Sequence, residues 1–129
     1  ITLRSSFAVW DGYGSVGEYL ALGMAKAGAR LDLVPLVYEP RGLTNELLEL
    51  IAKSQPQAGA PTLHFGPPPP DLGVFGSDNV FVNTMWEGSL LPASWVEPLN
   101  QVRAVIVPTR FVERVCRDSG VVAPPVGLG

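Results

Sequence analysis

The stretch FAVWDGYGSVGEYLALGMAKA, residues 7–27, decides the fold. Its first four residues form an apolar run, which predicts a short buried strand. Asp11 and Gly12 end this run, and from Ser15 apolar side chains recur at helical spacing as far as Gly28. A strand that leads through a glycine-rich turn into a helix is the first unit of a Rossmann-like fold.

The rest of the chain repeats this alternation of strand and helix. Further strands are predicted at residues 31–36, 62–65, 79–83 and 102–107, and helices are predicted to begin near residues 44, 94 and 109. Strands that alternate with helices imply right-handed crossovers and a parallel sheet. We therefore expect one α/β domain over residues 1–129, with a Rossmann-like parallel sheet and helices on both faces.

Local signals refine these elements. Thr44 and Thr109 can each cap a helix, and Ser94 with Glu97 has the spacing of a capping box. Pro35 cannot donate a hydrogen bond to a neighbouring strand, which places it at the end of a strand or on an edge of the sheet. The last helix is expected to turn one face inward, formed by Phe111, Val112, Val115 and Cys116.

The composition is that of a globular protein. Of the 129 residues, 47% are hydrophobic and 16% are charged, which is too apolar for a disordered chain. The formal net charge of −3 gives no positive surface for nucleic acid. No apolar run is long enough to cross a bilayer, and Cys116 is the only cysteine. We therefore expect a cytoplasmic protein without an internal disulfide, a metal site, a cofactor or an integral membrane segment.

The sequence GYGSVG at residues 12–17 matches the pattern G-x-G-x-x-G, follows a predicted strand and opens a predicted helix. That is the context of a dinucleotide site, in which the helix N-terminus binds a phosphate. Such a site also needs an acidic residue at the end of the second strand. Here Asp32 comes too early in that strand, and Glu39 falls late, in the loop after it. The motif predicts a glycine-rich ligand loop, with an NAD(P) site or a simple tight turn as alternatives.

An ordered series of residues in the second half carries a family resemblance. The series consists of Thr84-Met85-Trp86-Glu87, Leu91-Pro92, Trp95-Val96, Asn100 and Ala104-Val105-Ile106-Val107-Pro108-Thr109-Arg110-Phe111. In this order it resembles the N-terminal domain of group-one, retaining glycosyltransferases of the GT-B fold. The segments at 120–121 and 125–129 resemble the junction that follows in such proteins. The likeness extends from Phe7 to the end of the chain and is most specific between Thr84 and Phe111.

This resemblance implies the acceptor-side half of a two-domain enzyme. Members of the family bind the acceptor, a sugar or a lipid- or protein-linked group, on the N-terminal domain and the nucleotide-sugar donor on the C-terminal domain. Helix dipoles and basic side chains offset the charge of the leaving phosphate, so no metal is needed. The donor domain, with its E-x7-E segment, is absent from this sequence. We therefore expect a glycosyltransferase as the full-length protein and no turnover by this fragment alone.

The resemblance also implies site residues. The loop after the first strand would face the donor diphosphate and the transferred sugar, with contacts from Gly12, Tyr13, Gly14 and Ser15. A side chain at Gly14 is expected to intrude on the ligand and to leave the core pattern of the helix intact. Many relatives carry a histidine in a T-x-H pattern where this chain has Thr84-Met85-Trp86. In its place we expect Glu87 to act as the catalytic residue that contacts an acceptor hydroxyl.

The other candidate residues have structural interpretations beside the functional ones. Trp86 can stack on a sugar or belong to the core, and Thr109 can cap a helix while it faces the substrate cleft. His64, the only histidine, can line that cleft or only pack. Two other functions remain open for the chain as a whole. It can be an NAD(P)-type nucleotide-binding domain or a non-catalytic α/β interaction module.

Overall fold

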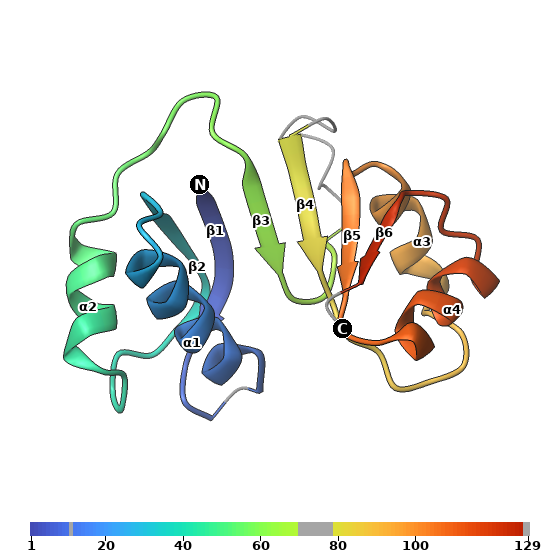
Figure 1. The fold of residues 1–129 in the computed structure, drawn as a ribbon. Coiled ribbons are helices and arrows are strands. Elements are labelled where there is room, and N and C mark those ends of the chain that lie inside the picture. The colour runs from blue at the N-terminus through green and yellow to red at the C-terminus, as the bar shows by residue number, and fades with distance from the viewer. Residues whose placement is uncertain (11, 70–78, 128–129) are drawn as a thin grey trace. The chain divides into compact units, whose positions relative to one another are not determined.

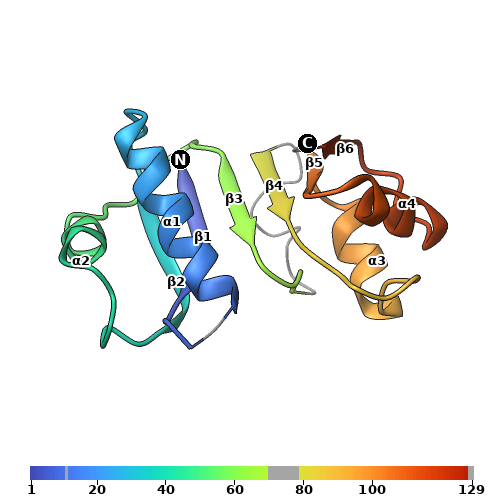
Figure 2. The same cartoon turned by 60° about the horizontal axis from the view of Figure 1, so that its bottom comes forward.

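The computed structural model describes residues 1–10, 12–69 and 79–127. Its contacts divide the chain into two compact units, Ile1–Phe65 (unit 1) and Gly66–Gly129 (unit 2). In each unit parallel strands are connected through helices, as Figure 1 and Figure 2 show. This confirms the predicted α/β, Rossmann-like fold class. The prediction of a single domain remains a prediction. Asp11 and residues 128–129, the last two of the predicted junction, lie outside the described residues.

Unit 1 is built on a parallel sheet with β1 in its middle. Its elements are β1 (Thr2–Phe7), α1 (Gly12–Lys26), β2 (Asp32–Tyr38), α2 (Asn45–Ala52) and β3 (Thr62–Phe65). Leu3 of β1 is level with Leu33 of β2 and Leu63 of β3, because β1 pairs in parallel with both strands. The three leucines belong to one apolar cluster to which α1 and α2 both contribute. His64 of β3 is also buried, with 1% of its surface exposed.

Two positions on the free edge of β2 offer no N–H to a further strand. The Asp32 N–H donates to the Ile1 carbonyl oxygen (2.9 Å). The backbone hydrogen-bonding groups of the alternate positions, Leu33 and Pro35, therefore point away from β1. Ser54 accepts the Leu33 N–H and donates to the Asp32 carboxylate at 2.7 Å. Pro35 has no N–H to offer. Pro35 thus lies on an edge strand, as the sequence predicted, and together with Ser54 it limits pairing at that edge.

The first strand and the first helix both begin earlier than predicted. β1 ends at Phe7, where the sequence predicted that it would begin, and α1 starts at Gly12 instead of Ser15. Ser5 and Ser6 are both buried in β1, and the Ser5 hydroxyl donates to the Ser6 carbonyl oxygen at 3.1 Å. These polar residues break the apolar pattern of the strand, so a prediction from hydrophobicity placed the strand too late.

Unit 2 has the same alternation. Its elements are β4 (Val80–Asn83), α3 (Ala93–Asn100), β5 (Ala104–Val107), α4 (Arg110–Asp118) and β6 (Pro125–Gly127). β5 pairs in parallel with β4 and with β6. Val82 of β4, Leu99 of α3 and Val115 of α4 are buried in one apolar cluster, which shares no residue with the cluster of unit 1.

Two of the three predicted helix caps are confirmed. Thr44 and Thr109 each accept a hydrogen bond from the backbone N–H three residues further on, and so cap α2 and α4. The capping-box prediction for Ser94 is wrong. The helix α3 begins two residues earlier than a Ser94 cap requires, with Pro92 as its N-cap residue and no side-chain hydrogen bond there. Proline is tolerated at a helix start because its missing N–H has no intrahelical acceptor at that position.

The inward face of α4 forms as predicted except at Phe111. Val112, Val115 and Cys116 are buried, whereas Phe111 is 52% exposed, because Val112 takes the inward position in the first turn. Desolvation by burial raises the pKa of the Cys116 thiol, which suits a core side chain. Among the described residues, no helix is long and apolar enough to cross a membrane, and no group of three or more His, Cys, Asp or Glu side chains could hold a metal ion.

Candidate functional site

Two of the three motif glycines allow α1 to pack closely against β1 and against Ala8, the residue that follows it. Gly14 is buried, and a β-carbon there would lie 2.7 Å from the backbone nitrogen of Ala8 and closer still to its carbonyl oxygen. A β-carbon at Gly17 would lie 2.9 Å from the Ser6 carbonyl oxygen. Neither glycine has a positive φ. Gly14 and Gly17 are therefore needed for close approach of helix and strand, a role that glycine has in this motif.

The first turn of α1 is open to a ligand at Gly12. A β-carbon at Gly12 would meet no atom within 4 Å, and both Gly12 and Ser15 are exposed. The N–H groups of a first helical turn have no intrahelical acceptor, and their partial positive charge favours a phosphate or hydroxyl oxygen. Tyr13, by contrast, packs its ring edge-to-face on Phe65 at 5.4 Å. Of the four contacts predicted in this segment, Gly12 and Ser15 are accessible, whereas Tyr13 and Gly14 take part in packing.

Trp10 is a candidate that the sequence pattern did not single out. It lies between β1 and α1 and is 69% exposed, although the sequence predicted a buried strand position there. An exposed indole offers a flat apolar surface with a polar N–H at its rim. Its position at the carboxyl end of a parallel strand is where ligands of open α/β sheets bind. The available signal was an aromatic residue two positions before the glycine motif, which the apolar pattern assigned to a strand.

An acidic residue does follow the second strand directly. β2 runs to Tyr38 instead of Leu36, so Glu39 is the first residue after it. The Glu39 N–H donates to the Phe7 carbonyl oxygen at the end of β1 (3.1 Å). The Glu39 carboxylate accepts hydrogen bonds from the backbone N–H (3.1 Å) and from Nε (3.3 Å) of Arg41. The prediction that no acidic residue stands at the end of the second strand is therefore wrong.

Trp86 is fixed by packing in unit 2. Its indole N–H donates to the Leu90 carbonyl oxygen at 2.7 Å, and its ring meets Trp95 edge-to-face with 5.0 Å between centroids. A β-carbon at Gly88 would lie 2.8 Å from the indole nitrogen, so the turn closes tightly on the ring. Glu87 lies in the same turn and is exposed. Trp86 thus holds the turn that presents Glu87, and a substrate contact by either residue remains a prediction.

Thr84 and Thr109 follow adjacent strands of unit 2. Thr84 directly follows β4, and Thr109 comes two residues after β5, which pairs with β4 in parallel. Thr84 is completely buried, and in the part of the chain that the structure describes its hydroxyl has no hydrogen-bond partner. The Thr109 side chain is exposed, with its hydroxyl committed to the cap of α4. A buried hydroxyl without a partner destabilises a fold, and native proteins keep few such groups without a functional reason.

Replacing Thr84 by valine is expected to raise the free energy of unfolding by about 1 kcal/mol, because valine keeps the shape and removes the unpaired hydroxyl. Thr109→Val is the matched control. It is expected to lower the free energy of unfolding by about 1 kcal/mol, because α4 loses its cap. Urea unfolding of the wild type and both variants measures the two changes. If Thr84→Val proves as unstable as Thr109→Val, the Thr84 hydroxyl has a stabilising partner and is not a candidate ligand group.

Comparison with known proteins found no relative of this chain. No family model, no curated protein and no solved structure matches the chain. Its function must therefore be argued from the residues that follow the carboxyl ends of the strands. These are Trp10, Gly12 and Glu39 in unit 1, and Thr84 and Glu87 in unit 2.

Proposed function

We propose that this chain is the acceptor-side domain of a retaining GT-B glycosyltransferase, which transfers a sugar from a nucleotide-sugar donor to an acceptor hydroxyl. The observation that carries the proposal is the exposed Trp10 before the open first turn of α1. Both features follow the carboxyl end of β1, the edge at which open α/β sheets bind ligands. The series from Thr84 to Phe111, by which the sequence resembles these enzymes, supports the same assignment.

The chemistry of these two features suits a carbohydrate. A sugar ring can pack its C–H face on the Trp10 indole while its hydroxyls stay free for hydrogen bonds. The backbone N–H groups of the first turn of α1 can donate to a hydroxyl or to a phosphoryl oxygen. Gly12 has no side chain to keep the ligand away from those groups. Trp10 would thus orient the ring, and the helix N-terminus would bind its oxygens.

Unit 2 carries candidate acceptor groups of its own. Glu87 is assigned to an acceptor hydroxyl, because an exposed carboxylate can accept the hydrogen bond of that hydroxyl. Thr84 and Thr109 add hydroxyl groups at the ends of adjacent strands. The nucleotide-sugar is assigned to a second domain. The chain itself is therefore expected to bind an acceptor sugar and not to turn it over.

Saturation-transfer NMR of the chain with a panel of mono- and disaccharides tests the proposal. We expect weak binding of at least one sugar, which disappears in Trp10→Ala and in Gly12→Val. Both variants should fold, because Trp10 is exposed and a β-carbon at Gly12 has no neighbour within 4 Å. Tyr19→Ala, which removes an aromatic that is 75% exposed further along α1, is the control. If the saturation-transfer signal is unchanged in Trp10→Ala, or if no sugar binds at all, the proposed sugar site is wrong.

A second candidate function is dinucleotide binding, and the position of Glu39 favours it. With β2 ending at Tyr38, the acidic residue stands where a nucleotide ribose would be held, beside the strand that leads into the glycine motif. Fluorescence titration of the chain with NADH and NADPH distinguishes the two functions. Saturable binding that Glu39→Gln weakens would support the dinucleotide site and displace the sugar site, since both use the first turn of α1.

A further inference from the structure

Three large apolar side chains are exposed where β1 and β2 end. Trp10, which follows β1, is 69% exposed, its neighbour Val9 is 51% exposed, and Tyr38, the last residue of β2, is 46% exposed. We call these three residues the apolar patch. Their strands are neighbours in the sheet and end at the same edge, because β1 and β2 pair in parallel. Exposed apolar side chains that gather at one place mark a binding surface.

Contacts between the two strand ends fix the position of the apolar patch. Phe7 pairs with Tyr38, and the Phe7 carbonyl oxygen accepts the Glu39 N–H (3.1 Å). A β-carbon at Gly42 would lie 3.1 Å from a methyl carbon of Val9, so Val9 packs closely against the loop that follows β2. Tyr38 directly precedes this loop of residues 39–42, and Val9 contacts the last residue of it. Both side chains therefore adjoin one short loop at the carboxyl edge of the sheet.

The two charges of that loop offset each other. Glu39 and Arg41 are the only charged residues at positions 39–42, and Nε of Arg41 lies 3.3 Å from the Glu39 carboxylate. The loop therefore has no net charge with which to select an anionic or a cationic ligand. The exposed surface that it shares with Val9 and Tyr38 favours an uncharged, apolar group, because such a group has little hydration to lose.

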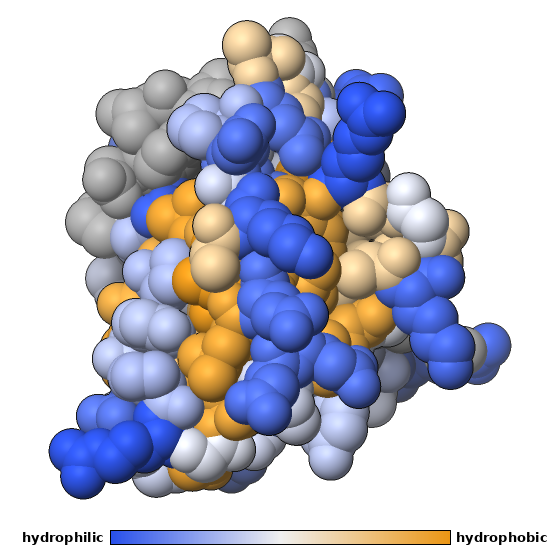
Figure 3. Space-filling model, turned by 90° about the vertical axis from the view of Figure 1, so that its left-hand side faces the viewer, coloured by the Kyte–Doolittle hydropathy of each residue, from blue (hydrophilic) through white to orange (hydrophobic). Residues whose placement is uncertain are grey.

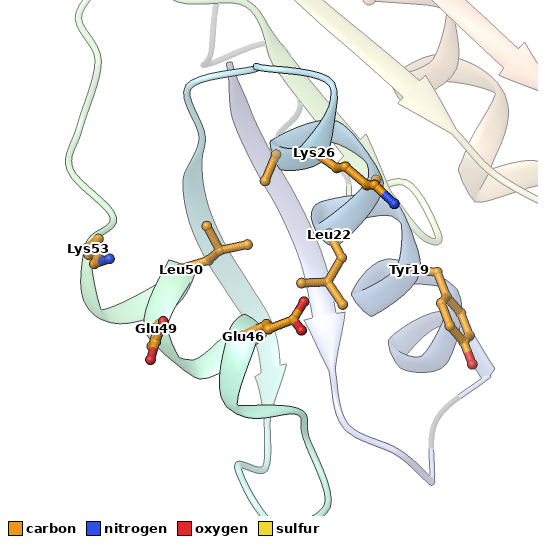
Figure 4. Close-up of a pocket in the computed structure, with 9 residues that line it drawn as sticks. Tyr19, Leu22, Lys26, Glu46, Glu49, Leu50 and Lys53 are labelled. Carbon is orange, nitrogen blue, oxygen red and sulfur yellow. The ribbon is translucent and has the colours of Figure 1, made fainter.

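A second exposed apolar surface of unit 1 is interrupted by charges. An open groove of about 660 Å³ lies between α1 and α2, and Figure 4 shows it in close-up. Besides Tyr19, Leu22 and Leu50, four charged side chains line this groove: Lys26, Glu46, Glu49 and Lys53. Figure 3 views the side of unit 1 that carries α2, where a band of hydrophilic side chains has hydrophobic surface on both sides of it. The apolar patch is therefore the better surface for an uncharged group, and the groove is its internal comparison.

We propose that the acceptor sugar carries an apolar group, and that Val9 and Tyr38 bind this group while Trp10 binds the sugar ring. The inference rests on the proposed function, because it takes the sugar to lie on the Trp10 indole. An aliphatic chain joined to that sugar would cover Val9 and Tyr38 and remove their apolar surface from water. A sugar ring alone has little apolar surface to bury, so the apolar group would supply most of the affinity.

NMR titration of the chain with methyl and hexyl glycosides of glucose, mannose and galactose tests the inference. We expect the hexyl glycoside of at least one sugar to bind at least about tenfold more tightly than its methyl counterpart, because the hexyl chain buries several more CH₂ groups. The double variant Val9→Ser with Tyr38→Thr should remove this gain and leave the affinity for the methyl glycoside unchanged. Both positions are about half exposed, so the variant should fold, which thermal unfolding followed by circular dichroism establishes.

Two single variants separate this inference from the proposed function. Trp10→Ala should abolish binding of both kinds of glycoside, whereas Tyr19→Ala, which removes an exposed aromatic of the groove, should keep the hexyl gain. Equal affinity for methyl and hexyl glycosides overturns the apolar group and leaves the sugar site standing. A hexyl gain that is lost in Tyr19→Ala but kept in the double variant places the chain in the groove, and overturns the inference in the same way. If no glycoside binds, or if binding survives Trp10→Ala, the proposed function and this inference are both wrong.

Discussion

Replacing Gly14 by valine is expected to lower the free energy of unfolding by about 3 kcal/mol or more. Gly14 is buried, and a β-carbon there would lie 2.7 Å from the Ala8 nitrogen and closer to the Ala8 carbonyl oxygen. Both contacts are with backbone, so no side chain can turn away to make room. The helix α1 would have to move off the strand, and the apolar cluster that it shares with Leu3 and Leu33 would lose contacts.

Urea unfolding of Gly14→Val beside Gly23→Ala measures this effect. Gly23 lies in the same helix, and a β-carbon there would meet nothing within 4 Å. Gly23→Ala is therefore expected to raise the free energy of unfolding by about 0.5–1 kcal/mol, because alanine favours a helix interior more than glycine does. A Gly14→Val variant with wild-type stability would contradict the packing role. It would restore the sequence-based expectation that a side chain at this position affects only a ligand.

The fold was predictable where its signals are local. The caps at Thr44 and Thr109 join a side chain to an N–H three residues away, and such bonds depend on few neighbours. The start of α3 is local too, but the sequence predicted it at Ser94, and the structure has Pro92 as the N-cap residue. The alternation of strands and helices needed only the apolar pattern, and so the α/β class was predictable.

Tertiary contacts explain what the sequence could not predict. The strand β1 contains buried Ser5 and Ser6, which a hydrophobicity pattern treats as surface positions. Because the strand ends at Phe7, Trp10 moves from an expected core position to an exposed one beside the glycine motif. Likewise β2 extends two residues further than predicted and brings Glu39 to its end. Small shifts of strand boundaries thus changed which side chains stand at the candidate site.

The glycine motif shows why a pattern match does not assign roles to its members. Gly12 and Gly14 are equivalent in the pattern, yet Gly12 has open space and Gly14 contacts backbone. Only the packing of α1 on β1 separates the two positions. Thr84 is a similar case in unit 2, because its burial and unpaired hydroxyl depend on the surrounding strands and helices. Thr84 belongs to the series of residues that carries the family resemblance, but the sequence alone did not predict that its hydroxyl would be buried.

Leu99→Ala is expected to lower the stability of unit 2 by about 2–5 kcal/mol, the cost of removing a fully buried leucine and leaving a cavity. Leu99 is 0% exposed in α3 and packs in the cluster that contains Val82 and Val105. Leu90→Ala is the matched control. Leu90 is 60% exposed, so its loss should change the stability by less than about 0.5 kcal/mol.

Native-state hydrogen exchange can locate the effect of Leu99→Ala. The cluster around Leu99 shares no residue with the cluster around Leu3, so each unit has an apolar core of its own. We therefore expect amides of β4 and β5 to lose protection in this variant more than amides of β1 and β2 do, because unit 2 opens as a separate cooperative segment. Equal loss of protection in all four strands would mean that the two cores unfold together, as one cooperative domain.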